Sequence, residues 1–191
     1  MLNNFANIFK FRPRAAFTLV EVVTALFIIM VGIFGGYELV NKSIVAAKSI
    51  SMRLTAVYLG KEGVEIVKSI RDTNYLKIHY GADGAYTWTN GLAAGGVPSS
   101  TDCTIPNGGC IAQSDSSRLS NVNDTDVNQP LKYSDSTGFG YLAGNVTAYK
   151  RKITITPQVD YLNVVVTVTW SEHGNDHATV VRENIYNWWQ E

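Results

Sequence analysis

One acid inside an apolar stretch is the first residue that points to a specific chemical role. Glu21 lies in the segment from Phe17 to Tyr37, FTLVEVVTALFIIMVGIFGGY, in which every other residue is uncharged. A charge in the middle of a membrane-spanning helix costs about 2.5 to 3.5 kcal/mol on insertion scales. Glu21 is therefore expected to have an ionic partner, unless its side chain merely extends to the membrane surface.

Two cysteines could form a disulfide. Cys103 and Cys110 are the two cysteines of the chain, and they flank the turn-forming segment TIPNGG. In an oxidising compartment this spacing predicts a bond that closes a short loop. Such a bond stabilises a fold by about 2 to 3 kcal/mol, mainly by restricting the unfolded chain. Metal binding by the pair is the weaker alternative, because no second ligand pair lies at a suitable spacing.

A short acidic run offers a weak candidate calcium site. Asp124, Asp126 and Asn128 alternate along the chain as calcium ligands do. An EF-hand loop needs a glycine directly after them, and this position is Gln129. The sequence otherwise predicts no metal and no cofactor.

The histidines and the basic residues form no catalytic or nucleic-acid-binding pattern. His79 is isolated, and His173 and His177 flank a predicted turn without a third ligand. We expect no enzymatic activity, because no nucleophile, base and acid converge. The triplet Lys150-Arg151-Lys152 lies in a strand-like stretch and is expected on a solvated face, so no nucleic-acid partner is predicted.

The apolar segment has the length of a membrane span. About 21 residues of helix cover about 31 Å, which matches the hydrocarbon layer of a bilayer. Lys10, Arg12 and Arg14 precede the segment without acidic neighbours, which predicts a cytoplasmic N-terminus and an external remainder. Cleavage after the span is not expected, because the chain continues past Tyr37 with helical spacing.

The residues around the start of this span resemble a known processing site. Arg14-Ala15-Ala16-Phe17-Thr18-Leu19-Val20-Glu21, a basic leader followed by a small residue and FTLVE, is similar to the N-terminus of type IV prepilins and type II secretion pseudopilins. The family usually has glycine where this chain has Ala16. The resemblance covers about 25 residues, and the rest of the chain resembles the family only in architecture.

The resemblance implies a processing and assembly route. A membrane peptidase would cut between Ala16 and Phe17 and methylate the new amine of Phe17. Glu21 of an incoming subunit would then neutralise the Phe17 amine of its neighbour. The implied partners are the membrane, other pilin subunits, the prepilin peptidase, a cytoplasmic assembly ATPase and an inner-membrane platform protein, and the product is a surface filament or a secretion pseudopilus.

Two classes of function stay open at this point. The preferred interpretation is a structural subunit, closest to minor pilins that end in a strand hairpin with tryptophan. The alternative is an anchored external binding or adhesion module that does not polymerise, with its ligand on the tryptophans and polar loops. An extracellular hydrolase would need a convergent catalytic set that the sequence does not display.

The apolar helix is predicted to continue as an amphipathic one and to end at Asp72-Thr73-Asn74. Its apolar positions recur every three or four residues and need a sheet to cover them: Val40, Ile44, Ala47, Ile50, Leu54, Val57, Val64, Val67 and Ile70. Gly32 and Gly36 form a GxxxG pair that favours close helix approach, or else reflects the ordinary glycine content of membrane helices. Gly60 and Gly63 are expected to let the helix pack closely on the sheet.

The predicted fold is α+β, with this long helix packed on a C-terminal antiparallel sheet. Strands are expected at 152–156, 162–170 and 178–185, with Leu162 to Trp170 alternating toward the helix. Between them lie turns at Pro157–Asp160 and Glu172–Asp176, and a short strand is also expected at Tyr86–Thr89. The predicted regions are a leader at 1–16, a polymerisation helix at 17–37, its amphipathic continuation at 38–72, a loop-rich variable region at 73–147 and the sheet at 148–191.

Overall fold

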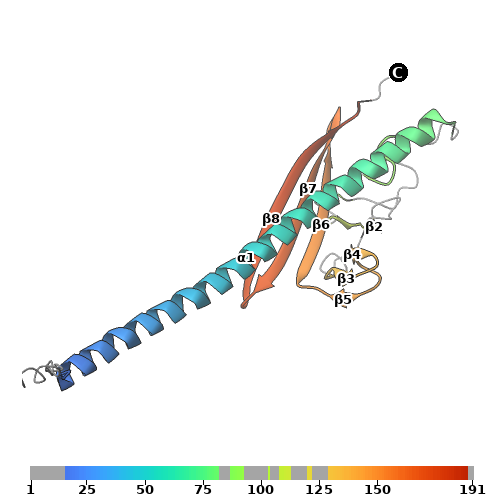
Figure 1. Ribbon diagram of the computed structural model, residues 1–191. Helices are drawn as coiled ribbons and strands as arrows, with labels where there is room; N and C mark the ends of the chain where they lie inside the picture. The colour runs from blue at the N-terminus through green and yellow to red at the C-terminus, as the bar shows by residue number, and fades with distance from the viewer. Residues whose placement is uncertain are drawn as a thin grey trace, which may run out of the picture. The chain divides into compact units, whose positions relative to one another are not determined.

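The computed structural model describes residues 16–81, 87–92, 103, 108–112, 120–121 and 129–188. The chain divides into two compact units, Met1–Lys48 and Ser49–Glu191. Its architecture is α+β, with one long N-terminal helix and a C-terminal antiparallel sheet, and this part of the prediction is confirmed (Figure 1). Most of the predicted leader, residues 1–15, lies outside the described residues.

Helix α1 spans Leu19–His79. The predicted end at Asp72–Asn74 is wrong, because Asn74 does not cap the helix. Its side-chain nitrogen instead donates to the carbonyls of Trp88 (3.1 Å) and Asn90 (2.7 Å). Gly81, in the left-handed conformation (φ 82°), follows the helix end.

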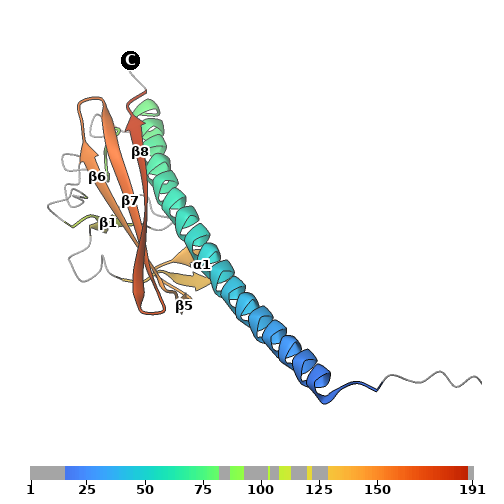
Figure 2. The same cartoon turned by 90° about the vertical axis from the view of Figure 1, so that its left-hand side faces the viewer.

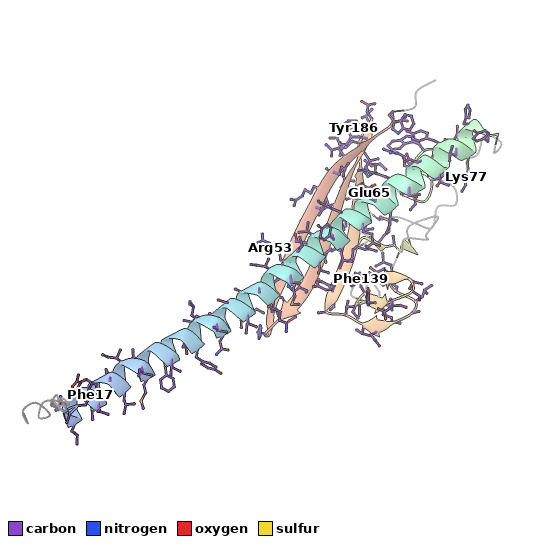
Figure 3. All side chains as sticks on the ribbon, viewed as in Figure 1. Phe17, Arg53, Glu65, Lys77, Phe139 and Tyr186 are labelled. Atoms are coloured by element: carbon purple, nitrogen blue, oxygen red, sulfur yellow. A yellow bond between two sulfur atoms is a disulfide. The ribbon has the colours of Figure 1, made fainter. Side chains whose placement is uncertain are left out.

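The first unit contains the apolar part of α1. Every residue from Ala16 to Lys48 is exposed, so this stretch buries none of its apolar side chains within the chain. Figure 3 shows side chains projecting outward all along the helix from Phe17. Within the described residues, α1 is the helix that is long and apolar enough to cross a membrane.

The second unit is built on a five-stranded antiparallel sheet of order β2-β1-β6-β7-β8. Its strands are β1 Cys110–Ile111, β2 Ser120–Asn121, β6 Tyr149–Pro157, β7 Tyr161–Glu172 and β8 Asn175–Tyr186. Strand β7 pairs antiparallel with β6 on one side and, along its full length, with β8 on the other, so both predicted hairpins exist.

The turn between β7 and β8 is shorter than predicted. It consists of His173 and Gly174, both with positive φ (51° and 80°), which is the backbone of a type I′ turn. Glu172 and Asn175, expected in the turn, pair with each other and end the two strands. This turn fixes the register of the longest hairpin.

The segment predicted to be a loop-rich region contains further structure. A second sheet of order β4-β3-β5 is formed by β3 Lys132–Ser134, β4 Gly138–Gly140 and β5 Asn145–Val146. The strands escaped prediction because they have only two or three residues and glycine at both ends of β4. The strand expected at Tyr86–Thr89 is wrong for its described part, where Thr87 to Leu92 form turns.

The core lies between α1 and the inner face of the main sheet (Figure 2). The predicted alternation on β7 is confirmed, because its inner-face residues are all buried: Leu162, Val164, Val166, Val168 and Trp170. The helix buries mainly Ala56, Leu59, Val64, Val67 and Ile70.

The predicted apolar stripe on the helix is wrong in its first half. Val40, Ile44, Ala47, Ile50 and Leu54 are exposed. Within the second unit, burial on the helix begins near Met52, which packs partly buried against the core. The spacing of the stripe is correct as a pattern, but the sheet covers only its later half.

Candidate functional site

The start of α1 brings together the residues predicted for processing and assembly. Ala16 and Phe17 are exposed just before the helix. The Thr18 hydroxyl accepts a hydrogen bond from the backbone N–H of Glu21 (3.3 Å), so Thr18 caps the helix N-terminus. The peptide bond between Ala16 and Phe17 therefore lies in non-helical, exposed backbone.

This geometry gives Glu21 a role that our sequence interpretation missed. Thr18 and Glu21 have the spacing of a capping box, and Glu21 is the acid of the first helical turn. An acid in this position is stabilised by the positive end of the helix dipole. The Ser/Thr-x-x-Glu spacing was the signal for it. The acid therefore stabilises the start of the helix.

The predicted packing glycines face open space. A Cβ built on Gly32, Gly35 or Gly36 would meet no atom within 4 Å. Glycines four residues apart lie on one face of a helix, so Gly32 and Gly36 place no side chains on that face. Gly60 and Gly63 differ, since a Cβ there would approach Val181 to 2.7 Å and Val166 to 2.8 Å. Their predicted role in helix-to-sheet packing is confirmed.

The basic triplet on β6 does not form a solvated face. Lys150 is exposed, but Arg151 is fully buried because it is on the inner face of the sheet. Its Nη1 lies 3.1 Å from Glu62 Oε2 and donates to the Leu59 carbonyl (3.2 Å). Its Nη2 donates to the Ala112 carbonyl (2.7 Å). One side chain thus joins the helix, the sheet and the segment after the disulfide.

Tyr141 extends this buried group. Its hydroxyl donates to the backbone carbonyl of Arg151 (3.0 Å). Burial raises the pKa of the Tyr141 phenol above its ordinary value of 10.0, although the nearby Arg151 guanidinium acts in the opposite direction. This bond ties the segment after β4 to β6.

A second polar link joins the helix to β8. Lys68 Nζ lies 2.7 Å from Glu183 Oε1 and 3.0 Å from Glu65 Oε1. Hydrogen bonds to Glu183 and then to Glu65 raise the pKa of the Lys68 ammonium above its ordinary 10.5. The lysine stays charged at neutral pH and fixes the helix above this strand.

The predicted disulfide between Cys103 and Cys110 is present. Both cysteines are fully buried, and their Cα atoms are 5.0 Å apart. The Cys103 carbonyl accepts a hydrogen bond from Ile155 N–H (2.9 Å), and Cys110 pairs with Ile153. The disulfide loop is therefore attached to β6.

The described residues contain no group of three metal-ligating side chains. His173 is in the hairpin turn, whereas the ring of His177 stacks on Trp170 with centroids 5.5 Å apart. The weak calcium candidates Asp124, Asp126 and Asn128 lie outside the described residues.

Two aromatic pairs include residues near the C-terminal end of the described chain. The rings of Tyr75 and Trp188 are 5.2 Å apart, and Tyr161 and Tyr186 form a second pair at 5.3 Å. Trp188 is 59% exposed and Tyr186 is 55% exposed, so they could contact a ligand. Figure 3 shows Tyr186 at the end of its strand. Trp189 lies outside the described residues.

Comparisons of the chain with protein-family models, with curated proteins and with solved structures find no match. The function is therefore argued from the residues of the chain. The start of α1, with its exposed peptide bond and its single acid, is the candidate functional site.

Proposed function

We propose that the chain is a type IV pilin-like structural subunit, a minor pilin or a pseudopilin, that is inserted in the cytoplasmic membrane and assembled into a surface filament or secretion pseudopilus. One observation carries the proposal. A basic leader, a small residue, FTLVE and a long apolar helix follow one another in order, and the helix begins at Leu19, directly after its Thr18 cap and close to the expected cut. An ordinary membrane anchor needs neither the acid nor this order.

The position of Glu21 supports pairing between subunits. Cleavage after Ala16 would leave a cationic amine on Phe17, which lies before the helix cap, and the Glu21 carboxylate lies one helical turn further on. Neither group is buried within the chain. In the hydrocarbon layer of a membrane, each of these charges alone has a high desolvation free energy. A neighbouring subunit that supplies the opposite charge lowers this free energy for both groups.

The uncovered helix surface supports assembly through helix packing. The apolar side chains of the first unit are exposed, and the glycine face at Gly32 and Gly36 is open. Small residues let apolar helices approach closely in a membrane. The partners of the proposed function are the membrane, further pilin subunits, the prepilin peptidase, the assembly ATPase and the platform protein.

A second candidate is an anchored adhesion module that does not polymerise. The exposed rings of Tyr186 and Trp188 favour it, because exposed aromatic side chains are common in binding surfaces. This candidate predicts an intact N-terminus at Met1, whereas the pilin proposal predicts a new N-terminus at Phe17.

Mass spectrometry of membrane and sheared surface fractions distinguishes the two candidates. The pilin proposal predicts a chain that begins at Phe17 and carries one methyl group on its amine. A mature chain that retains Met1 would contradict it and favour the adhesion module.

A substitution at the acid tests the mechanism. Glu21→Gln should reduce the filament fraction about tenfold or more, because the Phe17 amine loses its partner. Glu38→Gln is the matched control, since Glu38 is an exposed acid further along the same helix, 3.8 Å from Lys42. Normal filament yield from Glu21→Gln, with the leader removed, would overturn the proposed pairing.

A further inference from the structure

Strand β8 forms a long free edge of the main sheet. All twelve of its residues, Asn175–Tyr186, pair with β7 on one side. On its other side it pairs with no strand of the described part, and Figure 1 shows it as the outermost strand of the sheet. A free edge presents unpaired N–H and C=O groups that can bind another strand. An edge of this length is about twice the usual strand.

The two edges of the sheet do not match each other. At the opposite edge, β2 Ser120–Asn121 has two residues, which cannot pair with most of β8. Head-to-tail extension of the sheet would therefore leave β8 largely open. The strand that matches the length of β8 is the β8 of a second copy.

We propose that β8 is a self-association edge, and that two copies of the chain pair their β8 strands antiparallel about Thr179 to form one continuous sheet. The proposal concerns the second unit and does not depend on whether the chain assembles into filaments. It names the partner as this same polypeptide.

Charge complementarity selects the register. Asp176 and Arg182 are exposed, lie on the same face of β8 and are equally far from Thr179. Pairing about Thr179 places Asp176 of each copy opposite Arg182 of the other, and Ala178 opposite Val180. Pairing about Asp176 or about Arg182 would instead oppose like charges, which is destabilising. Within the described residues, neither side chain has an ion-pair partner of its own.

The helix leaves room for a second copy. Gly60 of α1 lies above Val168 and Val181, and Gly63 lies above Val166, so the helix runs over β7 and the β7 side of β8. In the paired sheet two such helices would be about two to three strand spacings apart, roughly 10 to 14 Å. Packed helices need about 8 to 10 Å between their axes, so the two helices do not collide.

Cysteine cross-linking of the full-length protein in detergent tests the register. Opposed residues of an antiparallel pair have Cα atoms about 4.5 to 5.5 Å apart, within the range of a disulfide. Thr179→Cys should therefore give a covalent dimer on mild oxidation. Asn184→Cys is the control on the same strand, because two copies of residue 184 would be about 34 Å apart. The native cysteines are bonded and buried, so they give no background.

Charge reversal distinguishes dimerisation through the β8 edge from dimerisation through the apolar part of α1. Asp176→Arg and Arg182→Asp should each weaken the dimer about tenfold in sedimentation equilibrium, because each opposes two like-charged pairs. The double variant D176R/R182D restores both pairs and should recover the original dimer constant. No cross-link at Thr179→Cys, an equal cross-link at Asn184→Cys, or no recovery in the double variant would overturn the proposal.

Discussion

Arg151 joins three parts of the second unit with one side chain. Its guanidinium contacts Glu62 on α1 and the carbonyls of Leu59 and Ala112. Removing one partner of a buried ion pair is costly, because the remaining charge stays in a poorly solvated place. The two halves of this pair are not equivalent, since the Arg151 side chain is fully buried and that of Glu62 is 33% exposed.

The difference in exposure predicts different costs for the two partners. Glu62→Gln leaves a buried cation without a counter-ion and should lower the free energy of unfolding by about 2 to 3 kcal/mol. Arg151→Met removes that cation, and the Glu62 carboxylate can turn to water, so the loss should be smaller. Urea unfolding followed by circular dichroism measures both.

The double variant E62Q/R151M provides the control. Its loss should be close to that of Arg151→Met alone, because the buried charge has gone. Additive losses would show that the two side chains act independently.

Tyr141 predicts a loss of stability at alkaline pH. The tyrosine of the unfolded chain ionises near pH 10, whereas burial keeps the native phenol protonated to a higher pH. Above pH 10 the unfolded state therefore releases its proton first, and the free energy of unfolding falls as pH rises.

Tyr141→Phe isolates this contribution. At pH 8 the variant should be less stable than the parent by about 1 kcal/mol, because the hydrogen bond to the Arg151 carbonyl is lost. This difference in the free energy of unfolding between the parent and the variant should become smaller between pH 9 and pH 11, since phenylalanine does not ionise. A difference that stays constant over this range would contradict the prediction.

At the scale of elements, glycines set the distance between α1 and the sheet. A Cβ on Gly63 would lie 2.8 Å from Val166 Cγ1 and 3.4 Å from Arg151 Cδ. Gly63→Ala should lower the free energy of unfolding by about 1 to 2 kcal/mol, because overpacking exceeds the gain in helix propensity. Chemical denaturation of the full chain measures this change in the free energy of unfolding.

Two variants make this test specific. Gly36→Ala, with open space around the new methyl group, should not lower stability. In a Val166→Ala background the extra methyl of Gly63→Ala fills space, so it should increase stability there. If Gly63→Ala lowered the free energy of unfolding equally with Val166 and with Val166→Ala, packing against Val166 would not be the cause.

The long elements could be predicted from the sequence because their patterns repeat. Alternation from Leu162 to Trp170 identified β7 and its buried face, and helical spacing identified α1. The burial of Arg151 could not be predicted, because its partners Glu62 and Ala112 are distant in the sequence. The helix end was missed for a similar reason, since Asn74 bonds to a later turn.

At the scale of the whole molecule, the second unit contains its own core. The buried cluster begins at Ala56 and includes no residue of the first unit. A chain that starts at Ser49 should therefore fold, keep the Cys103–Cys110 bond and unfold cooperatively. Circular dichroism and thiol titration check this, and a chain that starts at Arg71, without most of the helical core residues, is the negative control. Failure of the Ser49 chain to fold would show that the apolar helix is needed for the fold.

The complete burial of both disulfide sulfurs has a consequence for the order of maturation. An oxidising enzyme must touch a thiol to remove its electrons, and in the finished structure Cys103 and Cys110 are out of reach. Oxidation therefore has to precede the docking of Cys110 beside Ile153. Once closed, the bond is shielded from external reductants for as long as the second unit stays folded.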